Sequence, residues 1–394
     1  MKDEVLPILL NSYHRLRDTR LQKCFLYCSL YPEDSLCSRE ELIGYFISEE
    51  LMERRSSWKA EVDQGHAILN QLARACLLES GSYGGLKMHD LIREMAIRIT
   101  KEKPRFMVKA GFHLKELPEE QEWTEDLDKV SLMRNSIEEI SPGTSPKSPS
   151  LSTLILSRNP LRSIPDCFFT HMCGLRTLNL SRTDIESLPN SISDLEKLNA
   201  LFLEFCYKLV SVPSLEKLKV LKHLNLAYTG VKEIPRGMES LTNLKRLSLL
   251  HSTLNMIPTG TLHRLTHLQR LELPYYFEVP IEEVKALKQL ELLQCRLNSV
   301  RDLNRLINSR QSDKQFLSYN IKLSSQEFDP PLEFNFSMGK YLIFGEKSLV
   351  EFSSDTDGNM LPQDVERLFF EDSGLRDCLL DEFPIPNSVR ECEI

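Results

Sequence analysis

The sequence lacks the features that would place it in a membrane or in an oxidising compartment. No apolar run approaches the ~18–20 residues that a membrane-spanning helix needs. The N-terminus, residues 1–7, carries acidic residues early and does not resemble a secretory signal. Ten cysteines are scattered from Cys24 to Cys392 without a C-x-x-C pair. We therefore expect a cytoplasmic chain with reduced thiols rather than a disulfide framework.

Signatures of catalysis and of metal binding are also missing. The sequence contains neither a G-x-S-x-G elbow nor an H-E-x-x-H zinc motif. Cys24 and Cys28 lie on one face of a predicted helix, but no matching pair of ligands follows, so we interpret them as core residues. The formal net charge of -8 disfavours nucleic acid as a partner. The sequence therefore predicts a protein that is not an enzyme and has no metal site.

An internal repeat runs through most of the chain. The pattern L-x-x-L-x-L recurs with its middle leucine at 154, 178, 201, 224, 247 and 271, and Leu127-x-x-Val130-x-Leu132 is an earlier copy. Steps of 23 or 24 residues are typical of leucine-rich repeats, in which each unit adds one short parallel strand. One unit cannot bury its own leucines, so stacked units share a continuous core. We therefore predict a curved leucine-rich-repeat solenoid with regular units over 127–300.

The second half of each unit keeps the same phase. Apolar pairs such as Leu161/Ile164 recur there and are often followed by proline, which suits a side without regular strands. A small polar residue precedes these pairs, and we expect it to satisfy backbone groups at the bend after the strand. This position holds Asn135, Asn159, Thr183, Cys206, Thr229 and Ser252.

The repeat becomes irregular beyond Leu273. The next recognisable copy is Leu287-x-x-Leu290-x-Leu292, and residues 301–360 contain only strand-like alternation at 317–321 and 341–343. The phase returns around Leu368 and Cys392, so the given chain ends inside a repeat. We therefore predict irregular, truncated repeats over 301–394.

A column of side chains recurs two positions after the third apolar residue of each unit. Side chains between the leucines point away from the core, so we expect this column on the concave face, in contact with a protein partner or another domain. Arginine and tyrosine are frequent at interface hot spots, although an ordinary solvated face is the alternative. The column consists of Arg134, Arg158, Arg182, Phe205, Tyr228, His251 and Tyr275.

Residues 1–103 lack the repeat and have helical patterns instead. The predicted helices are 21–30, 38–51 with a capping box at its start, 60–75 and 90–100. A hairpin is predicted before the last helix, with strands near 77–79 and 86–88 around the turn at 80–85. Three helices, a hairpin and a closing helix predict a winged-helix-like module, which a linker over 104–126 joins to the repeats.

Two stretches of this module resemble a known family. The segment from Cys24 to Asp34 (CFLYCSLYPED) precedes the segment from Met88 to Ala96 (MHDLIREMA), and both lie ahead of the repeats. In this order they closely resemble plant intracellular immune receptors of the nucleotide-binding (NB-ARC), leucine-rich-repeat type, in the coiled-coil class. The resemblance implies an α/β protein. It places the end of a preceding helical subdomain at 1–16 and a winged-helix subdomain with an MHD motif at 17–103, followed by the leucine-rich-repeat solenoid.

The resemblance also implies a nucleotide switch. In that family the histidine of the MHD motif, here Met88, His89 and Asp90, approaches the β-phosphate of bound ADP, and Asp90 would orient the loop and help to cap the next helix. An ordinary surface histidine is the alternative. No G-x-x-x-x-G-K-[ST] loop occurs in the sequence. We therefore expect no cofactor for this chain, and ADP or ATP contact by His89 only together with the missing nucleotide-binding domain.

The leading functional interpretation is part of a plant disease resistance protein. Its repeats would recognise a pathogen effector or a guarded host protein and hold the switch closed, and the winged helix would relay the signal. The alternative is a leucine-rich-repeat adaptor, decoy or scaffold protein without nucleotide switching. A transcription factor that uses the winged helix on DNA is disfavoured by the acidic charge and by the lack of a basic recognition helix.

Overall fold

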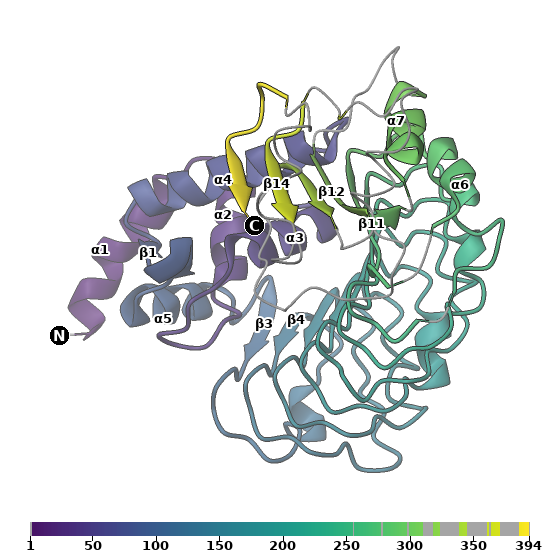
Figure 1. The fold of residues 1–394 in the computed structure, drawn as a ribbon. Coiled ribbons are helices and arrows are strands. Elements are labelled where there is room, and N and C mark those ends of the chain that lie inside the picture. Colours follow the sequence, from purple (N-terminus) through teal and green to yellow (C-terminus); the bar gives the residue numbers. More distant parts are fainter. Residues whose placement is uncertain are drawn as a thin grey trace. The chain divides into compact units, whose positions relative to one another are not determined.

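The chain forms two compact units. The computed structural model describes residues 2–254, 256–276, 279–297, 299–309, 318–323, 339–344, 361, 364–370 and 386–393. One unit comprises Met1–Asn225 with Pro235–Gly237, and the other comprises Leu226–Ile234 with Met238–Ile394. The first unit contains the helical module and the first repeats, coloured purple to teal in Figure 1, and the second contains the later repeats.

The helical module has the predicted elements. The hairpin pairs β1 (Glu79–Ser80) with β2 (Leu86–Lys87) in antiparallel fashion. The predicted helix 38–51 is shorter, because Glu50 adopts a left-handed backbone with φ 55° that ends it after Ser48. The helices are α1 (Lys2–His14), α2 (Thr19–Cys28), α3 (Arg39–Ser48), α4 (Trp58–Arg74) and α5 (Asp90–Ile99), with a short 3-10 helix η1 (Ser82–Gly84) in the hairpin turn.

Local chemistry explains where these helices begin and how closely they pack. Asp18, Ser38 and Ser57 precede α2, α3 and α4, and each side chain accepts a backbone N–H of the first turn. Gly65 allows α4 to approach α3, since a Cβ atom there would lie 2.6 Å from Cγ1 of Ile43. The apolar faces of α2, α3, α4 and α5 contribute to one buried core.

The repeats of the first unit build a parallel sheet with the predicted register. Leu154 pairs with Val130 and Leu178, and Leu201 pairs with Leu178 and Leu224. All of these apolar residues are fully buried. Its strands are β3 (Arg105–Val108), β4 (Leu127–Ser131), β5 (Thr153–Ile155), β6 (Thr177–Asn179), β7 (Ala200–Phe202) and β8 (His223–Asn225), with 3-10 helices η2 (Glu120–Glu122) and η3 (Asn190–Asp194) between them.

The prediction of a linker over 104–126 is wrong. Residues Arg105–Val108 form β3, which pairs in parallel with β4. Trp123 is buried, and its ring packs edge-on against Phe168. The segment therefore behaves as an additional first repeat. Its sequence signal is weak, because only the apolar pair Leu114/Leu117 with the following proline matches the repeat pattern.

The small polar residues after the strands satisfy backbone groups, as predicted. Asn159 donates from Nδ2 to the carbonyls of Leu132 and Leu156, at 2.9 and 2.8 Å, and its Oδ1 accepts the N–H of Ile137. Where the slot holds Thr183, Thr229 or Ser252, the hydroxyl donates to the carbonyl three residues earlier. Each bend is thus closed by a buried side chain.

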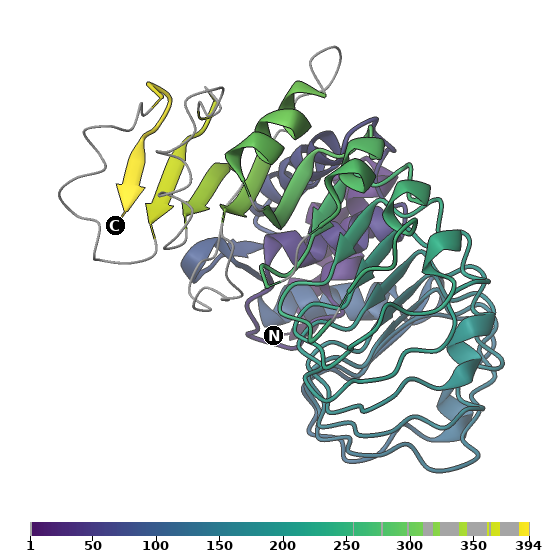
Figure 2. The same ribbon diagram turned by 45° about the vertical axis from the view of Figure 1, so that its right-hand side comes forward.

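The second unit continues the repeat, and Figure 2 shows several of its strands as parallel arrows. Leu368 pairs with Cys392, and the alternation at 341–343 lies in a strand, both as predicted. Leu317 and Ile394 lie outside the described residues. The elements are β9 (Arg246–Ser248), β10 (Arg270–Glu272), β11 (Leu292–Leu297), β12 (Ser318–Leu323), β13 (Lys340–Phe344), β14 (Arg367–Phe370) and β15 (Glu391–Glu393), with α6 (Ile281–Ala286), α7 (Val300–Asn308), η4 (Met238–Ser240) and η5 (Leu262–Arg264).

One predicted register in this unit is wrong. The prediction placed Leu290 in the middle position, but Leu271 pairs with Leu293. Leu290 and Leu293 are both buried, and the closely spaced leucines at 290, 292 and 293 offer more than one phase. Pairing with β10 selects the later one.

No helix in the described part of the chain is long and apolar enough to cross a bilayer.

Candidate interface between the winged helix and the repeats

The strand face of the first unit contacts α3 through a buried ion pair. Nζ of Lys129, on β4, lies 2.7 Å from Oε2 of Glu49, which caps the C-terminus of α3. The same ammonium group donates to Ser152 and Thr153 and lies 5.4 Å from the centre of the Tyr27 ring. Lys129 and Glu49 are only 6% and 7% exposed. Burial removes water from both charged groups, so each charge needs the other to offset the cost of its lost hydration.

Aromatic and amide side chains extend the contact along β6 and β7. The ring of Tyr45, on α3, packs edge-on against Phe202 at 5.5 Å, and its hydroxyl oxygen accepts the amide of Asn179. Asn199 donates to the carbonyl of Ser48 at 3.0 Å. That carbonyl belongs to the last turn of α3, where backbone acceptors have no partner within the helix. The repeats therefore complete the end of α3.

A second charged group lies at the end of α3. Oε1 of Glu50 lies 2.6 Å from Nζ of Lys222, and the carboxylate also pairs with Arg54 and, at 4.0 Å, with Arg176. Burial alone would raise the pKa of Glu50, but hydrogen bonds from Lys222 and Arg54 outweigh it and lower the pKa to about 2. Glu50 is therefore held ionised between the winged helix and the repeats.

An aromatic contact joins α4 to β8, the last strand of the first unit. Trp58, the first residue of α4, packs edge-on against the buried His223 of β8, with ring centres 5.5 Å apart. Met133 and Ile155 of the repeats also join the same buried core as the winged-helix residues. In the first unit the winged helix thus covers positions between the leucines of the strands.

The predicted column lies beside the strands rather than on them. Six of its members adopt a left-handed backbone, with φ between 48° and 61°, at the third residue after the strand and one residue before the polar slot. The three arginines are exposed, while Phe205, Tyr228 and His251 are half-buried. Tyr275 differs from these six residues. It is buried in a cluster with Tyr341, Ile343 and Phe369.

The basic half of the column faces the winged helix. Burial raises the pKa of Glu41, on α3, and the positive charges of Arg158 and Arg182 oppose that rise. The guanidinium of Arg182 stacks on Phe205 at 3.9 Å, and the exposed Tyr207 packs against Phe205. In the second unit Tyr228 and His251 stack at 4.5 Å. The column therefore combines contact with another part of the chain and exposed surface.

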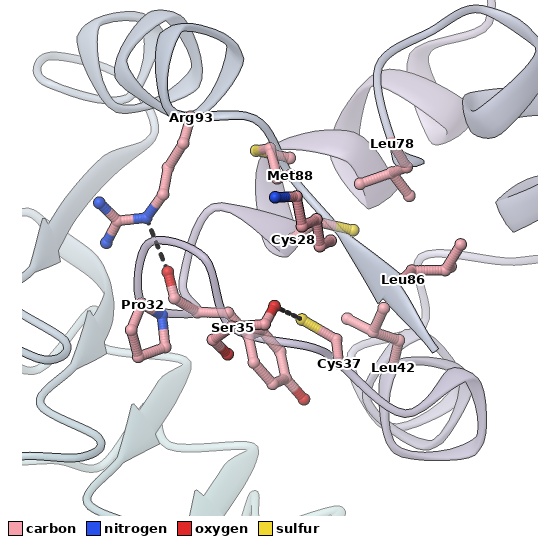
Figure 3. Close-up of a pocket in the computed structure, with 11 residues that line it drawn as sticks. Cys28, Pro32, Ser35, Cys37, Leu42, Leu78, Leu86, Met88 and Arg93 are labelled. Carbon is pink, nitrogen blue, oxygen red and sulfur yellow. Dashed lines mark hydrogen bonds between the residues drawn. The ribbon is translucent and has the colours of Figure 1, made fainter. Parts of the chain in front are cut away.

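The MHD motif opens α5, and its three side chains differ in environment. Met88 is buried and lines a small cavity with Cys28, Cys37 and Leu86 (Figure 3). His89 is exposed, and its Nδ1 accepts the N–H of Leu91 at 3.2 Å. The proton of a neutral His89 ring therefore lies on Nε2, which is left as a donor.

The N-cap of α5 differs from the prediction. We predicted that Asp90 would help to cap this helix, but His89 is the N-cap and Asp90 is the first helical residue. An acidic residue in the first turn still complements the positive end of the helix dipole. Figure 3 also shows Arg93, whose Nε donates to the carbonyl of Tyr31 at 2.7 Å and so ties α5 to the segment after α2.

Cys24 and Cys28 of the winged helix are core residues, as predicted, whereas Cys76 is exposed. Cys24, Cys28 and Cys37 are buried, and Cys28 donates from Sγ to the carbonyl of Cys24. Burial raises the pKa of each of these thiols, so they stay protonated and are poor metal ligands. In the described part of the chain no group of three or more His, Cys, Asp or Glu side chains is arranged to hold a metal ion.

The sequence did not reveal the residues that join the two parts. They are Tyr45, Glu49, Glu50 and Trp58 on the winged helix and Lys129, Asn179, Lys222 and His223 on the repeats. A usable signal was the polar character of Lys129, Asn179 and His223 at strand positions that are buried in the structure. Buried polar groups need partners, which would have indicated a covered face.

Comparison with protein families supports both parts of this arrangement. Residues 30–96 match the disease resistance protein winged helix domain, and residues 149–207 match a leucine rich repeat model. The chain is therefore a leucine-rich-repeat protein with a winged-helix domain. An internalin from Listeria monocytogenes is a distant structural neighbour, 17% identical with a TM-score of 0.47, over 77% of this chain and 81% of that one.

Relatives with similar sequences are more specific. Disease resistance protein RPS5 of Arabidopsis thaliana is 36% identical over 77% of this chain and 36% of that protein. Disease resistance protein UNI of the same plant is 37% identical over 69% of this chain and 31% of that protein. The resemblance to plant disease resistance proteins seen in the sequence is confirmed. The chain spans about a third of the length of these relatives.

Proposed function

We propose that this chain is the winged-helix and leucine-rich-repeat part of a cytoplasmic plant disease resistance receptor. Its repeats hold the winged helix in the resting arrangement and recognise a pathogen effector or a guarded host protein. The observation that carries this proposal is the buried pair of Glu49 and Lys129, which joins the end of α3 to the repeats. A contact that buries opposite charges is specific, because either charge alone would be strongly destabilising.

The experiment compares the complete reading frame of the gene with variants of this contact after expression in leaf tissue. Lys129→Glu places two carboxylates together and is expected to release the winged helix, so that cell death follows without a pathogen. Lys147→Glu makes the same charge change at an exposed position and is expected to stay silent. Equal behaviour of the two variants, at equal protein levels, would contradict an autoinhibitory role.

The alternative function is an adaptor, decoy or scaffold without nucleotide switching. The surface at and beside the column favours partner binding in either case, since the exposed Arg182 and Tyr207 both pack against the half-buried Phe205. If the chain is a scaffold, the Arg158→Ala, Arg182→Ala double variant is expected to lose binding of its partner. Lys129→Glu is then expected to have no effect on cell death. The receptor proposal requires an effect of Lys129→Glu.

The nucleotide role of His89 belongs to the full-length receptor. With Nδ1 occupied by the N–H of Leu91, Nε2 is the nitrogen that would donate to a phosphate of ADP held by an upstream domain. A single hydrogen-bond donor is not sufficient to form a nucleotide-binding site. We therefore expect no binding of ADP or ATP to this chain by itself in calorimetric titration, and micromolar affinity would contradict this assignment.

A further inference from the structure

The loop between α3 and α4 contains a pair of arginines followed by two serines, Arg54-Arg55-Ser56-Ser57. Counted from Ser57, the arginines occupy the positions three and two residues before the hydroxyl. Both are exposed, and so is Ser56, while Ser57 is half-buried with an extended backbone (φ -128°, ψ 149°). An extended, basic segment ahead of a hydroxyl suits an acidic substrate cleft, because opposite charges select and orient the bound chain.

This combination occurs at one accessible position in the described structure. Among all serines and threonines of the sequence, only Ser57 and Ser248 have lysine or arginine both three and two residues before them. Ser248 follows Lys245 and Arg246, but it lies inside β9 and is 2% exposed. A strand residue of the core cannot enter the cleft of another protein without unfolding. Ser57 is therefore the hydroxyl that has both basic residues before it and an accessible position in the described structure.

The charge around the loop favours an added anion. Three cations, Arg54, Lys222 and Arg176, share the single carboxylate of Glu50. Arg55 lies 2.9 Å from Glu53, whose carboxylate also pairs with Arg20. Arg54 is 73% exposed, so it can leave Glu50 at little cost while Lys222 remains in place. The loop thus has guanidinium groups to offer to a phosphate.

We propose that Ser57 is a phosphorylation site for a protein kinase that prefers basic substrates. The Oγ atom of Ser57 attacks the γ-phosphorus of magnesium-bound ATP on the kinase, and the bond from this phosphorus to the β,γ-bridging oxygen breaks. ADP leaves, and the hydroxyl proton passes to the catalytic base of the kinase. The product is a phosphate ester on the loop between α3 and α4.

The product also has a physical consequence for this loop. The ester carries about -1.5 to -2 charges at neutral pH and binds arginine in bidentate fashion. It therefore draws Arg54 away from Glu50 and leaves that carboxylate to Lys222 and Arg176. Ser57 already accepts the N–H of Ala60 at the start of α4, and a phosphate oxygen can take over this role. The site does not depend on the proposed receptor function.

The test uses the purified chain, magnesium ATP and the catalytic subunit of a cyclic-AMP-dependent protein kinase, with the modified residue identified by mass spectrometry. Ser57→Ala is expected to abolish incorporation in the loop, whereas Ser56→Ala is expected to retain it. Replacing Arg54 and Arg55 by alanine is expected to lower kcat/KM by roughly 10-fold or more, since each lost charge-assisted hydrogen bond corresponds to about that factor. Thermal melts of all variants verify that they are folded.

Two outcomes would overturn the proposal. One is incorporation that persists in Ser57→Ala at the wild-type rate. The other is phosphorylation of a synthetic peptide of residues 50–61 but not of the folded chain, because the loop would then be inaccessible in the structure. Neither outcome affects the contact between Glu49 and Lys129, which the cell-death experiment tests separately.

Discussion

Glu49 ends α3 with a carboxylate that lies 2.7 Å from the ammonium group of Lys129, and the pair is buried between the winged helix and the repeats. A negative charge is unfavourable at the C-terminus of a helix, where the dipole is itself negative. Lys129 offsets this cost, and it comes from a strand 80 residues further along the chain. The folding of the repeats and the end of α3 are therefore coupled.

The first prediction concerns this coupling. Glu49→Gln and Lys129→Met each leave one buried charge without its partner and are expected to lower the free energy of unfolding by roughly 3–5 kcal/mol. The double variant is expected to recover most of this loss. Urea unfolding of the four proteins gives the interaction free energy as a double-mutant cycle. Losses that simply add would mean that the two charges do not depend on each other.

A matched control exists on α4. Lys59 and Asp63 form an ion pair of 2.6 Å, but their side chains are 48% and 59% exposed. Lys59→Met is therefore expected to change the free energy of unfolding by less than about 1 kcal/mol. A similar cost at Lys59 and Lys129 would show that burial does not govern these pairs.

A second prediction concerns the bend after β5. Asn159→Ala removes two donated hydrogen bonds and one accepted bond, and it leaves the carbonyls of Leu132 and Leu156 and the N–H of Ile137 without this partner. The expected loss is roughly 2–4 kcal/mol, since unsatisfied buried backbone groups each cost about 1–3 kcal/mol. Thermal unfolding followed by circular dichroism measures it. Ser136→Ala, at an exposed neighbouring position, is expected to have little effect.

The sequence predicted the repeats well because the same spacing returns in every unit. A leucine every 23 or 24 residues allows one parallel register. The structure has this register from Val130 to Leu224 in the first unit and from Leu247 to Leu271 in the second. The prediction failed where the signal is incomplete or ambiguous. β3 lacks the leucine pattern, and the leucines at 290, 292 and 293 fit more than one phase.

The site was predictable only in part. The MHD motif and the arginine column are visible because neighbouring residues or a fixed period define them. The contact between α3 and the strands is not, because it matches side chains from segments with no common spacing, such as Tyr45 with Asn179. Physical complementarity between distant segments leaves no periodic trace in one sequence. The left-handed backbone of the column was also hidden, because arginine at such a position carries no glycine signal.

A third prediction concerns acid. Glu50 has a pKa of about 2 in the folded chain, below its ordinary value of 4.5. Between these values the unfolded chain binds the additional proton, so the stability that Glu50 contributes is present above about pH 4.5 and is lost as the pH falls through the folded value. Glu50→Gln is therefore expected to flatten the loss of stability between these two pH values. Urea titrations at several pH values measure it, and parallel curves for wild type and variant would contradict the assignment.

The last prediction tests the shared core of the repeats. Leu201 is fully buried and pairs with Leu178 and Leu224 on both sides. Leu201→Asp loses about 1.5–3 kcal/mol of apolar burial and adds an unpaired charge, which costs more. We expect the melting midpoint and the cooperativity of the first unit to fall together, because neighbouring units share this core. Val210→Asp adds the same charge at a position that is 58% exposed and is expected to shift the free energy of unfolding by about 0.5 kcal/mol or less. An unchanged melt for Leu201→Asp would mean that the units do not depend on one another.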